Sequence, residues 1–149
     1  MIISTSNINE IRKLIQNAKD KPIIVLAQTN ELNRKVLEFG KFDILLSVES
    51  LREKQKDKLK QLDSGLNHVL AKIAAKNGVS IGIDIEEISR LEKKDKAIRL
   101  ARIKQNIKIC RKAKCGIVIV NGKDAKNSFD FLISLGASSQ QAKKAVENS

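Results

Sequence analysis

The sequence has no tryptophan and no tyrosine, and phenylalanine occurs only four times in 149 residues. Proteins that recognise single-stranded nucleic acid usually stack its bases on aromatic side chains. Such a stacking platform is hard to assemble from so few rings. Any contact with nucleic acid should therefore be made to its backbone and shape.

Histidine and cysteine are also scarce, which limits the chemistry open to the chain: it has His68, Cys110 and Cys115. A metallohydrolase centre or a His-dependent triad needs more imidazoles or a dense cluster of carboxylates. The C-x4-C pair has no further Cys or His nearby to complete a tetrahedral metal site. We therefore expect reduced packing thiols, and we favour a hydrogen-bonded structural role for His68 over that of a catalytic base.

Long hydrophobic runs are missing as well. The longest, at 22–27 and 116–120, fall far short of the ~20 residues that cross a bilayer. Residues 1–4 lack the charged segment and long apolar stretch of a secretory signal. The sequence therefore predicts a cytoplasmic protein without a membrane span, and residues 1–149 fit one domain.

Charge is the feature in excess. The chain carries 29 Lys and Arg against 17 Asp and Glu, a formal net charge of +12. Lys and Arg that contact phosphates release condensed counterions, so the excess points first to nucleic acid and second to an anionic membrane. A solvated Lys-rich surface explains the charge alone equally well.

Hydrophobic periodicity predicts short strands alternating with helices. Strands are expected at 1–4, 22–28, 43–48, 79–85 and 116–121, and helices at 7–19, 31–39, 66–77 and 96–114, with two more after the last strand. This alternation indicates a parallel sheet with right-handed crossovers. A full eightfold barrel usually needs ~250 residues. The sequence therefore predicts an α/β fold of parallel β-α repeats, a shortened TIM-barrel-like fold that is either an incomplete barrel or an open curved sheet.

Polar residues and glycines predict where the helices begin and end. Asn30 is expected to cap the second helix, and Gly40, Gly78 and Gly116 are expected to end the second, third and fourth.

The third helix combines a core face with a polar start. Its apolar positions follow helical spacing, at Leu66, Val69, Leu70, Ile73 and Ala74. Asp63 or Ser64 is expected to cap its first turn, where free amides suit a phosphate. Lys72 projects from another face, together with Asn67 and His68.

Residues 50–61 differ in composition from their surroundings, because Arg52 and four lysines stand among few apolar residues. We predict a mobile basic loop there, at the face where α/β folds usually place ligand sites. A short solvated helix is the alternative.

The fourth helix pairs an apolar stripe with a dense set of cations. Leu100, Ile103, Ile107 and Cys110 should pack on the sheet. The rest of its surface carries Arg99, Arg102, Lys104, Lys108, Arg111 and Lys112, with no acid between Asp95 and Lys114. Repulsion among these cations favours an RNA or DNA phosphate partner, with a solvated helix face as the alternative.

Two isoleucines, Ile98 and Ile109, fall opposite that stripe, beside Arg102 and Lys112. A mixed apolar and cationic strip is typical of a partner surface. The alternative is that the C-terminal helix folds back and covers them.

Three blocks resemble the ribonuclease P protein component 3 family over roughly residues 42–146. The most specific is DSGLNHVLAKIA at 63–74. The second comprises Arg102-x-x-x-Asn106, Arg111-Lys112 and the strand at 116–120. The third is looser and comprises 126–130, 135–137 and 142–145, with Ser128 where proline is usual.

This resemblance implies a barrel-like fold and an RNA-binding subunit of ribonuclease P, the ribonucleoprotein endonuclease that removes the 5′ leader of precursor tRNA. The RNA component performs catalysis with Mg²⁺, so no cofactor is expected on the protein, which is itself expected to be non-catalytic. The implied partners are ribonuclease P RNA, protein component 2, other ribonuclease P proteins and precursor tRNA. Family members exceed 200 residues, so one or two first β-α units are expected to be missing.

The residues that we expect to contact RNA phosphates are Arg52, Lys72, Arg102, Arg111 and Lys112. Two other functions stay open: a protein-only metal-dependent phosphoesterase, and a basic interaction module without an RNA role. The shortage of metal ligands opposes the first. The lack of a basic amphipathic terminus with large apolar anchors opposes membrane binding by the second.

Overall fold

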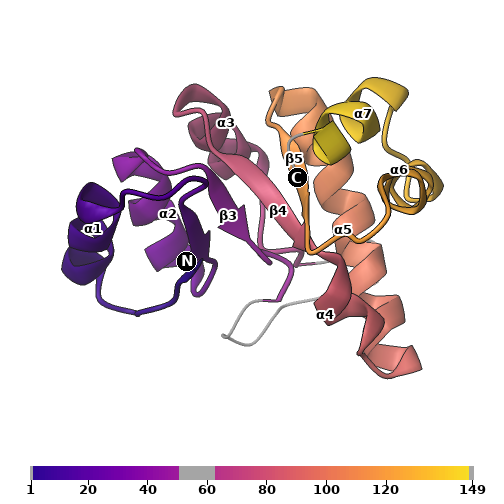
Figure 1. Ribbon diagram of the computed structural model, residues 1–149, viewed down its shortest axis with the longest axis horizontal. Coiled ribbons are helices and arrows are strands. Elements are labelled where there is room, and N and C mark those ends of the chain that lie inside the picture. The colour runs from indigo at the N-terminus through magenta and orange to yellow at the C-terminus, as the bar shows by residue number, and fades with distance from the viewer. Residues whose placement is uncertain (1, 51–62, 148–149) are drawn as a thin grey trace.

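The computed structural model describes residues 2–50 and 63–147 and is built on one five-stranded parallel sheet (Figure 1). The strands are β1 (Ile2–Ile3), β2 (Ile24–Leu26), β3 (Ile44–Leu46), β4 (Ser80–Asp84) and β5 (Ile117–Val120). The helices are α1 (Ile8–Asn17), α2 (Asn30–Phe39), α3 (His68–Lys76), α4 (Ile85–Ser89), α5 (Lys93–Ala113), α6 (Ala125–Ser134) and α7 (Ser139–Glu147). Residues 51–61 of the predicted basic loop, Arg52 included, lie outside the described residues.

The strands follow one another across the sheet in sequence order, β1-β2-β3-β4-β5, and each pairs in parallel with the next. Right-handed crossovers of this kind place successive connecting helices on the same face of a sheet. In the described residues, β1 and β5 are the two edges, so the sheet is open. The predicted parallel α/β fold is thus confirmed in its open-sheet form, not as a closed barrel.

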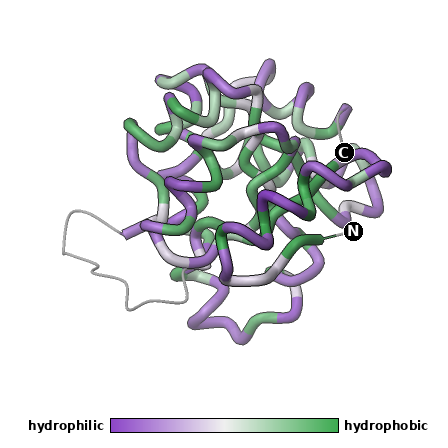
Figure 2. The backbone as a smooth tube through the Cα atoms, turned by 90° about the vertical axis from the view of Figure 1, so that its left-hand side faces the viewer, coloured by the Kyte–Doolittle hydropathy of each residue, from purple (hydrophilic) through white to green (hydrophobic). Residues whose placement is uncertain are grey.

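The main hydrophobic core lies between the sheet and the helices. Every strand contributes to it: β1, β2 and β3 through Ile3, Val25 and Leu45, β4 through Ile81 and Ile83, and β5 through Ile117 and Ile119. Helices contribute Ile11, Leu37 and Ile103, which are at most 1% exposed. Figure 2 shows hydrophobic stretches running through the interior of the fold and hydrophilic stretches around its outside.

The opposite face of the sheet is also apolar and is tightly packed at Gly82 in β4. A Cβ atom on Gly82 would lie 2.6 Å from Ile44 Cγ2 and 3.1 Å from Leu46 Cδ1. Both of these β3 side chains are buried. The side chains of β3 therefore leave no room for a side chain at Gly82.

The second helix begins one residue earlier than expected. Thr29 caps α2, because its side-chain oxygen accepts a hydrogen bond of 3.2 Å from the Leu32 N–H. The prediction that Asn30 caps this helix is wrong. Thr29 and Asn30 are both good capping residues in adjacent positions, and periodicity does not choose between them.

Two of the three helices that were predicted to end at a glycine do so. Gly40 follows α2 with φ 66°, and Gly78 follows the Asn77 cap of α3 with φ 69°. The prediction that Gly116 ends the fourth helix is wrong, because Lys114 takes the left-handed position with φ 59° and ψ 35°.

The short helix α4 has no counterpart in the predicted pattern, which continues β4 as a strand to residue 85. Asp84 ends β4 and caps α4, accepting a 3.1 Å hydrogen bond from the Glu87 N–H. A five-residue helix spans too few turns to show a periodic apolar face.

Candidate nucleic-acid interface

Helix α5 is 21 residues long and has one buried side. Ile103, Ile107 and Cys110 are at most 1% exposed, and Leu100 is partly buried against the core. The predicted apolar stripe is therefore confirmed. Its packing fixes which of the cations on α5 face outward.

Arg99 is an exception among the predicted surface cations, because it is only 7% exposed. Its Nε lies 3.1 Å from Glu49 Oε1, and its Nη1 lies 2.6 Å from Glu87 Oε1. The prediction that Arg99 adds to an uncompensated cationic surface is wrong. Its acidic partners lie 50 and 12 residues away along the chain, so local spacing could not reveal them.

Burial perturbs this ion-pair cluster. Burial raises the pKa of Glu49, and the opposing effect of the Arg99 charge is smaller. Burial by itself lowers the pKa of Arg99, but the two carboxylates more than offset it and the net direction is upward. The cluster is thus a structural element that joins α5 to the end of β3 and to α4.

The remaining cations of α5 lie at or near the surface. Lys104, Lys108, Arg111 and Lys112 are exposed, and Arg102 is half-buried. On α3, which packs against α5, Lys72 is exposed. Four predicted phosphate-contacting residues therefore lie on two adjacent helices, at Lys72, Arg102, Arg111 and Lys112.

A groove of 460 Å³ runs between α3 and α5. It is lined by His68, Gln105, Lys108, Ile109 and Lys112. The fold therefore brings two predicted site residues, Ile109 and Lys112, into one groove together with Lys108. The His68 side chain is exposed and makes no hydrogen bond to another described residue, so the predicted hydrogen-bonded structural role is wrong.

The turn before α3 is anchored to α5. Ser64 is buried, its Oγ accepts a 3.0 Å hydrogen bond from Gln105 Nε2, and its carbonyl accepts one of 3.1 Å from Asn106 Nδ2. The cap of α3 is Asn67, whose Oδ1 accepts from the N–H three residues further on. The prediction that Asp63 or Ser64 caps this helix is wrong, because the turn continues to Asn67 and the helix starts only at His68.

Three apolar side chains next to these cations are not fully buried. Val69 on α3 is 55% exposed and Ile98 on α5 is 38% exposed, whereas Ile109 is partly buried against the core. The assignment of Val69 to the core face is wrong, because Leu70, Ala71 and Ala74 form the buried face of α3. Ile109 faces the groove beside α3, and Ile98 lies about three turns earlier on α5.

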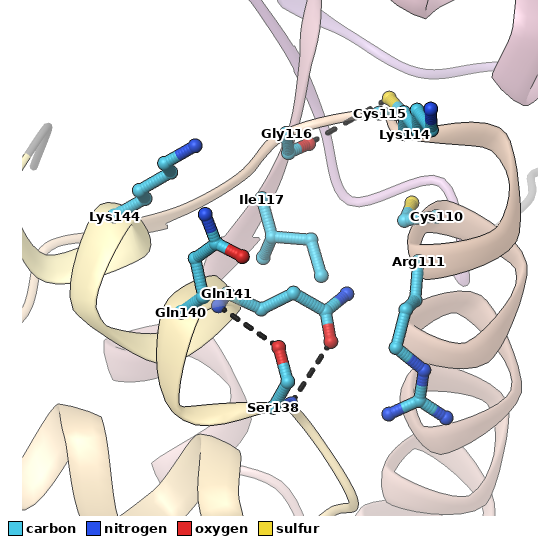
Figure 3. Close-up of a pocket in the computed structure, with 10 residues that line it drawn as sticks. All are labelled: Cys110, Arg111, Lys114, Cys115, Gly116, Ile117, Ser138, Gln140, Gln141 and Lys144. Atoms are coloured by element: carbon cyan, nitrogen blue, oxygen red, sulfur yellow. Dashed lines mark hydrogen bonds between the residues drawn. The ribbon is translucent and has the colours of Figure 1, made fainter.

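A second cavity, of 440 Å³, lies at the far end of α5 (Figure 3). It is formed by the last turn of α5, the start of β5 and the first half of α7. Three cations line it: Arg111, which was predicted, and Lys114 and Lys144, which were not. Sequence reasoning missed the last two because only the packing of α7 beside β5 brings them together.

The two cysteines border this cavity as buried free thiols, as predicted. A hydrogen bond between Cys110 and Cys115 raises the pKa of the Cys110 thiol and lowers that of Cys115. Cys115 Sγ also lies 3.5 Å from the carbonyl of Val79. Both side chains serve the packing between α5 and the sheet.

Metal-binding and membrane-spanning features were sought in the same residues. Across 2–50 and 63–147, no three His, Cys, Asp or Glu side chains are grouped so that they could hold a metal ion. No helix in these ranges is long and apolar enough to cross a bilayer.

Comparison with known proteins identifies relatives over most of the chain. Ribonuclease P protein component 3 of Methanococcus maripaludis strain C6 is 31% identical over 122 residues, which are 80% of this chain and 49% of that protein. The component 3 protein of Methanosarcina acetivorans is 33% identical over 109 residues, which are 73% of this chain and 41% of that protein. The component 3 protein of Methanocaldococcus jannaschii is 26% identical over 131 residues, which are 87% of this chain and 52% of that protein. No protein-family model matches.

Solved structures show the same fold. A chain in the cryo-EM structure of archaeal ribonuclease P with mature tRNA superimposes with a TM-score of 0.74 at 24% identity, covering 99% of this chain and 63% of that one. The crystal structure of an uncharacterized protein superimposes with a TM-score of 0.61 at 12% identity. The match covers 93% of this chain and 35% of that one. The chain spans about half the length of the curated relatives that it matches. The resemblance that the block at 63–74 first indicated is thus confirmed: over that half, this chain is a relative of ribonuclease P protein component 3.

Proposed function

We propose that this chain is an RNA-binding protein subunit of ribonuclease P that assists the RNA component in removing the 5′ leader of precursor tRNA. The observation that carries the proposal is the sequence relationship, since the relatives compared above share the name ribonuclease P protein component 3. The fold supports it, because a chain in an archaeal ribonuclease P structure has the same architecture.

The charge of the described surface fits such a role. Exposed Lys72, Arg111 and Lys112, with half-buried Arg102, lie on the adjacent helices α3 and α5. Arg52 in the basic segment is a further proposed phosphate contact. With few aromatic rings in the chain, these contacts read the RNA backbone and contribute little sequence preference.

The proposal extends to partners, cofactor and location. Its partners are ribonuclease P RNA, protein component 2 and other ribonuclease P proteins, with precursor tRNA as the substrate of the assembly. Ile98 and Ile109 are proposed as the apolar part of a protein-partner surface. The protein itself binds no cofactor, Mg²⁺ belongs to the RNA component, and the assembly works in the cytoplasm without membrane contact.

Reconstitution tests the proposal. Ribonuclease P RNA and protein component 2 are combined with or without this chain, and cleavage of precursor tRNA at the mature 5′ end is measured. We expect the chain to raise the cleavage rate and its affinity for RNA to fall steeply with salt. Arg111→Gln with Lys112→Gln should flatten the salt dependence, whereas the control Lys13→Gln on exposed α1 should not.

Two results would reject the proposal. Chelator-sensitive cleavage by the purified chain alone would favour a protein-only phosphoesterase. Failure to bind RNA or to stimulate the reconstituted enzyme would favour a basic interaction module without an RNA role.

A further inference from the structure

The cavity between α5, β5 and α7 is a cationic pocket on a well-ordered frame (Figure 3). Arg111 and Lys114 come from the α5 side, and Lys144 stands across from them on α7. All three side chains are exposed. No Asp or Glu is among the residues that line the cavity.

Hydrogen bonds fix the two walls of the pocket relative to each other. Gln141 on α7 donates from Nε2 to the Ile107 carbonyl of α5 at 3.1 Å. Arg111 donates from Nη1 to the Gly136 carbonyl at 2.9 Å, which leaves its other N–H groups to meet a ligand. The Arg111 guanidinium is therefore held in place before any ligand arrives.

The first turn of α7 adds to the positive potential. Ser138 caps it, with Ser138 Oγ accepting from the Gln141 N–H at 3.1 Å. The amides of Ser139 and Gln140 stand at the start of this helix, where an α-helix provides no acceptor of its own. Such amides and the positive end of the helix dipole favour an anion.

Cations near the end of α5 could serve only to stabilise that helix, since the carboxyl end of a helix attracts positive charge. Here two of the last four carbonyls, those of Cys110 and Arg111, already accept backbone hydrogen bonds. The Lys114 N–H bonds the carbonyls of Arg111 and Cys110, and the Cys115 N–H donates to Cys110 at 2.9 Å. Capping of α5 therefore does not require the amine of Lys114.

Lys114 also occupies a backbone position where glycine is preferred. Its φ of 59° and ψ of 35° are left-handed, which strains any residue with a Cβ. Glycine can therefore replace Lys114 without disturbing the backbone at this position.

We propose that this pocket binds a phosphate group of RNA through Arg111, Lys114 and Lys144. The inference rests on the proposed function for its ligand and locates one site of contact. The cavity of 440 Å³ is large enough for a phosphate with part of its sugar. The other lining residues hold no ring on which a base could stack; they are Cys110, Cys115, Gly116, Ile117, Ser138, Gln140 and Gln141.

Two variants test the pocket against one control, in the full chain. Lys114→Gly and Lys144→Gln each remove a pocket cation, and Lys143→Gln removes an exposed neighbour on α7 that does not line the cavity. Glycine suits the left-handed position, so Lys114→Gly should be as thermally stable as the wild type or more so. Loss of binding in this variant could not then be ascribed to unfolding.

Binding is measured with two probes. Inorganic phosphate should shift the amide NMR signals of Gly116, Ile117 and Gln140 in the wild type and in Lys143→Gln, but less in either pocket variant. For RNA, each pocket variant should bind several-fold more weakly and lower the slope of log affinity against log salt by about one. Matched oligonucleotides with a 5′-phosphate or a 5′-hydroxyl distinguish a terminal phosphate from a backbone phosphate.

The inference is overturned if both pocket variants keep the RNA affinity and salt slope of the wild type. If the wild type then still binds RNA and stimulates reconstituted ribonuclease P, the proposed function stands and only the pocket fails. A wild-type chain that binds no RNA would overturn both.

Discussion

Arg99 in α5 and Glu49 after β3 form an ion pair with a 3.1 Å contact, and their side chains are 8% and 1% exposed. Removing one member of such a pair leaves an uncompensated charge in the interior. Arg99→Met should therefore lower the free energy of unfolding by about 3–5 kcal/mol, as measured by urea denaturation.

The double variant Arg99→Met with Glu49→Leu provides the control for that prediction. Replacing both charges by apolar groups should recover most of the lost stability, since the buried carboxylate is gone as well. A double variant no more stable than Arg99→Met alone would show that the charge balance is not the cause.

The Glu49 carboxyl also predicts a pH dependence. Its pKa is raised by burial above the ordinary 4.5, so the folded protein holds more protons than the unfolded chain just above that pH. Stability should then fall as pH rises through this window. The wild type should lose stability relative to Glu49→Gln as pH increases from 4.5, and denaturation curves that stay parallel across the window would refute this.

Gly82 offers a test of sheet packing. Gly82→Ala would place a methyl group 2.6 Å from Ile44 Cγ2 and should destabilise the fold by about 1–3 kcal/mol. In the control Gly116→Ala, the methyl meets chiefly the Ser80 hydroxyl at 2.8 Å, which can rotate away. Thermal unfolding should show a clearly larger loss for Gly82→Ala, and equal losses would contradict the packing described.

The two isoleucines of α5 should differ in their effect on stability. Ile98→Ser should leave the melting temperature nearly unchanged, because Ile98 is 38% exposed, whereas Ile109→Ser should lower it, because Ile109 packs partly against the core. Both variants should weaken binding to protein component 2 if the strip is a partner surface. Binding equal to that of the wild type in Ile98→Ser would remove this residue from the interface.

The purified chain should not cut precursor tRNA with Mg²⁺, Mn²⁺ or Zn²⁺. It has a single histidine, and a hydrolytic metal centre needs several converging ligands. Product analysis on gels, with RNA-free protein, checks this. Cleavage at the mature 5′ end that stops on chelation would contradict it.

The strands were predictable because parallel strands buried on both faces are short continuous apolar runs, as at Ile117–Val120. Helices of nine or more residues also carry a periodic signal. The five-residue α4 carries no such signal. The choice between Thr29 and Asn30 as the cap of α2 depends on where the backbone lies at the end of β2. These details are set by tertiary packing.

The candidate site was predictable only in part, for a related reason. The exposed positions of Lys72, Arg111 and Lys112 follow from helical spacing alone. The burial of Arg99 depends on Glu49, which lies 50 residues away in the sequence. Lys114 and Lys144 likewise belong to separate elements and share a cavity only because α7 packs beside β5.

The order of the strands has a consequence for how the chain assembles. Since each strand pairs with the one before it, no pairing waits for a segment synthesised much later, and each connection joins two strands that are consecutive in the sequence. Closing a loop costs entropy that grows with its length, so contacts that are local in sequence favour fast folding. The growing sheet presents its newest strand as the template for the next. The sheet can therefore form stepwise from its first strand.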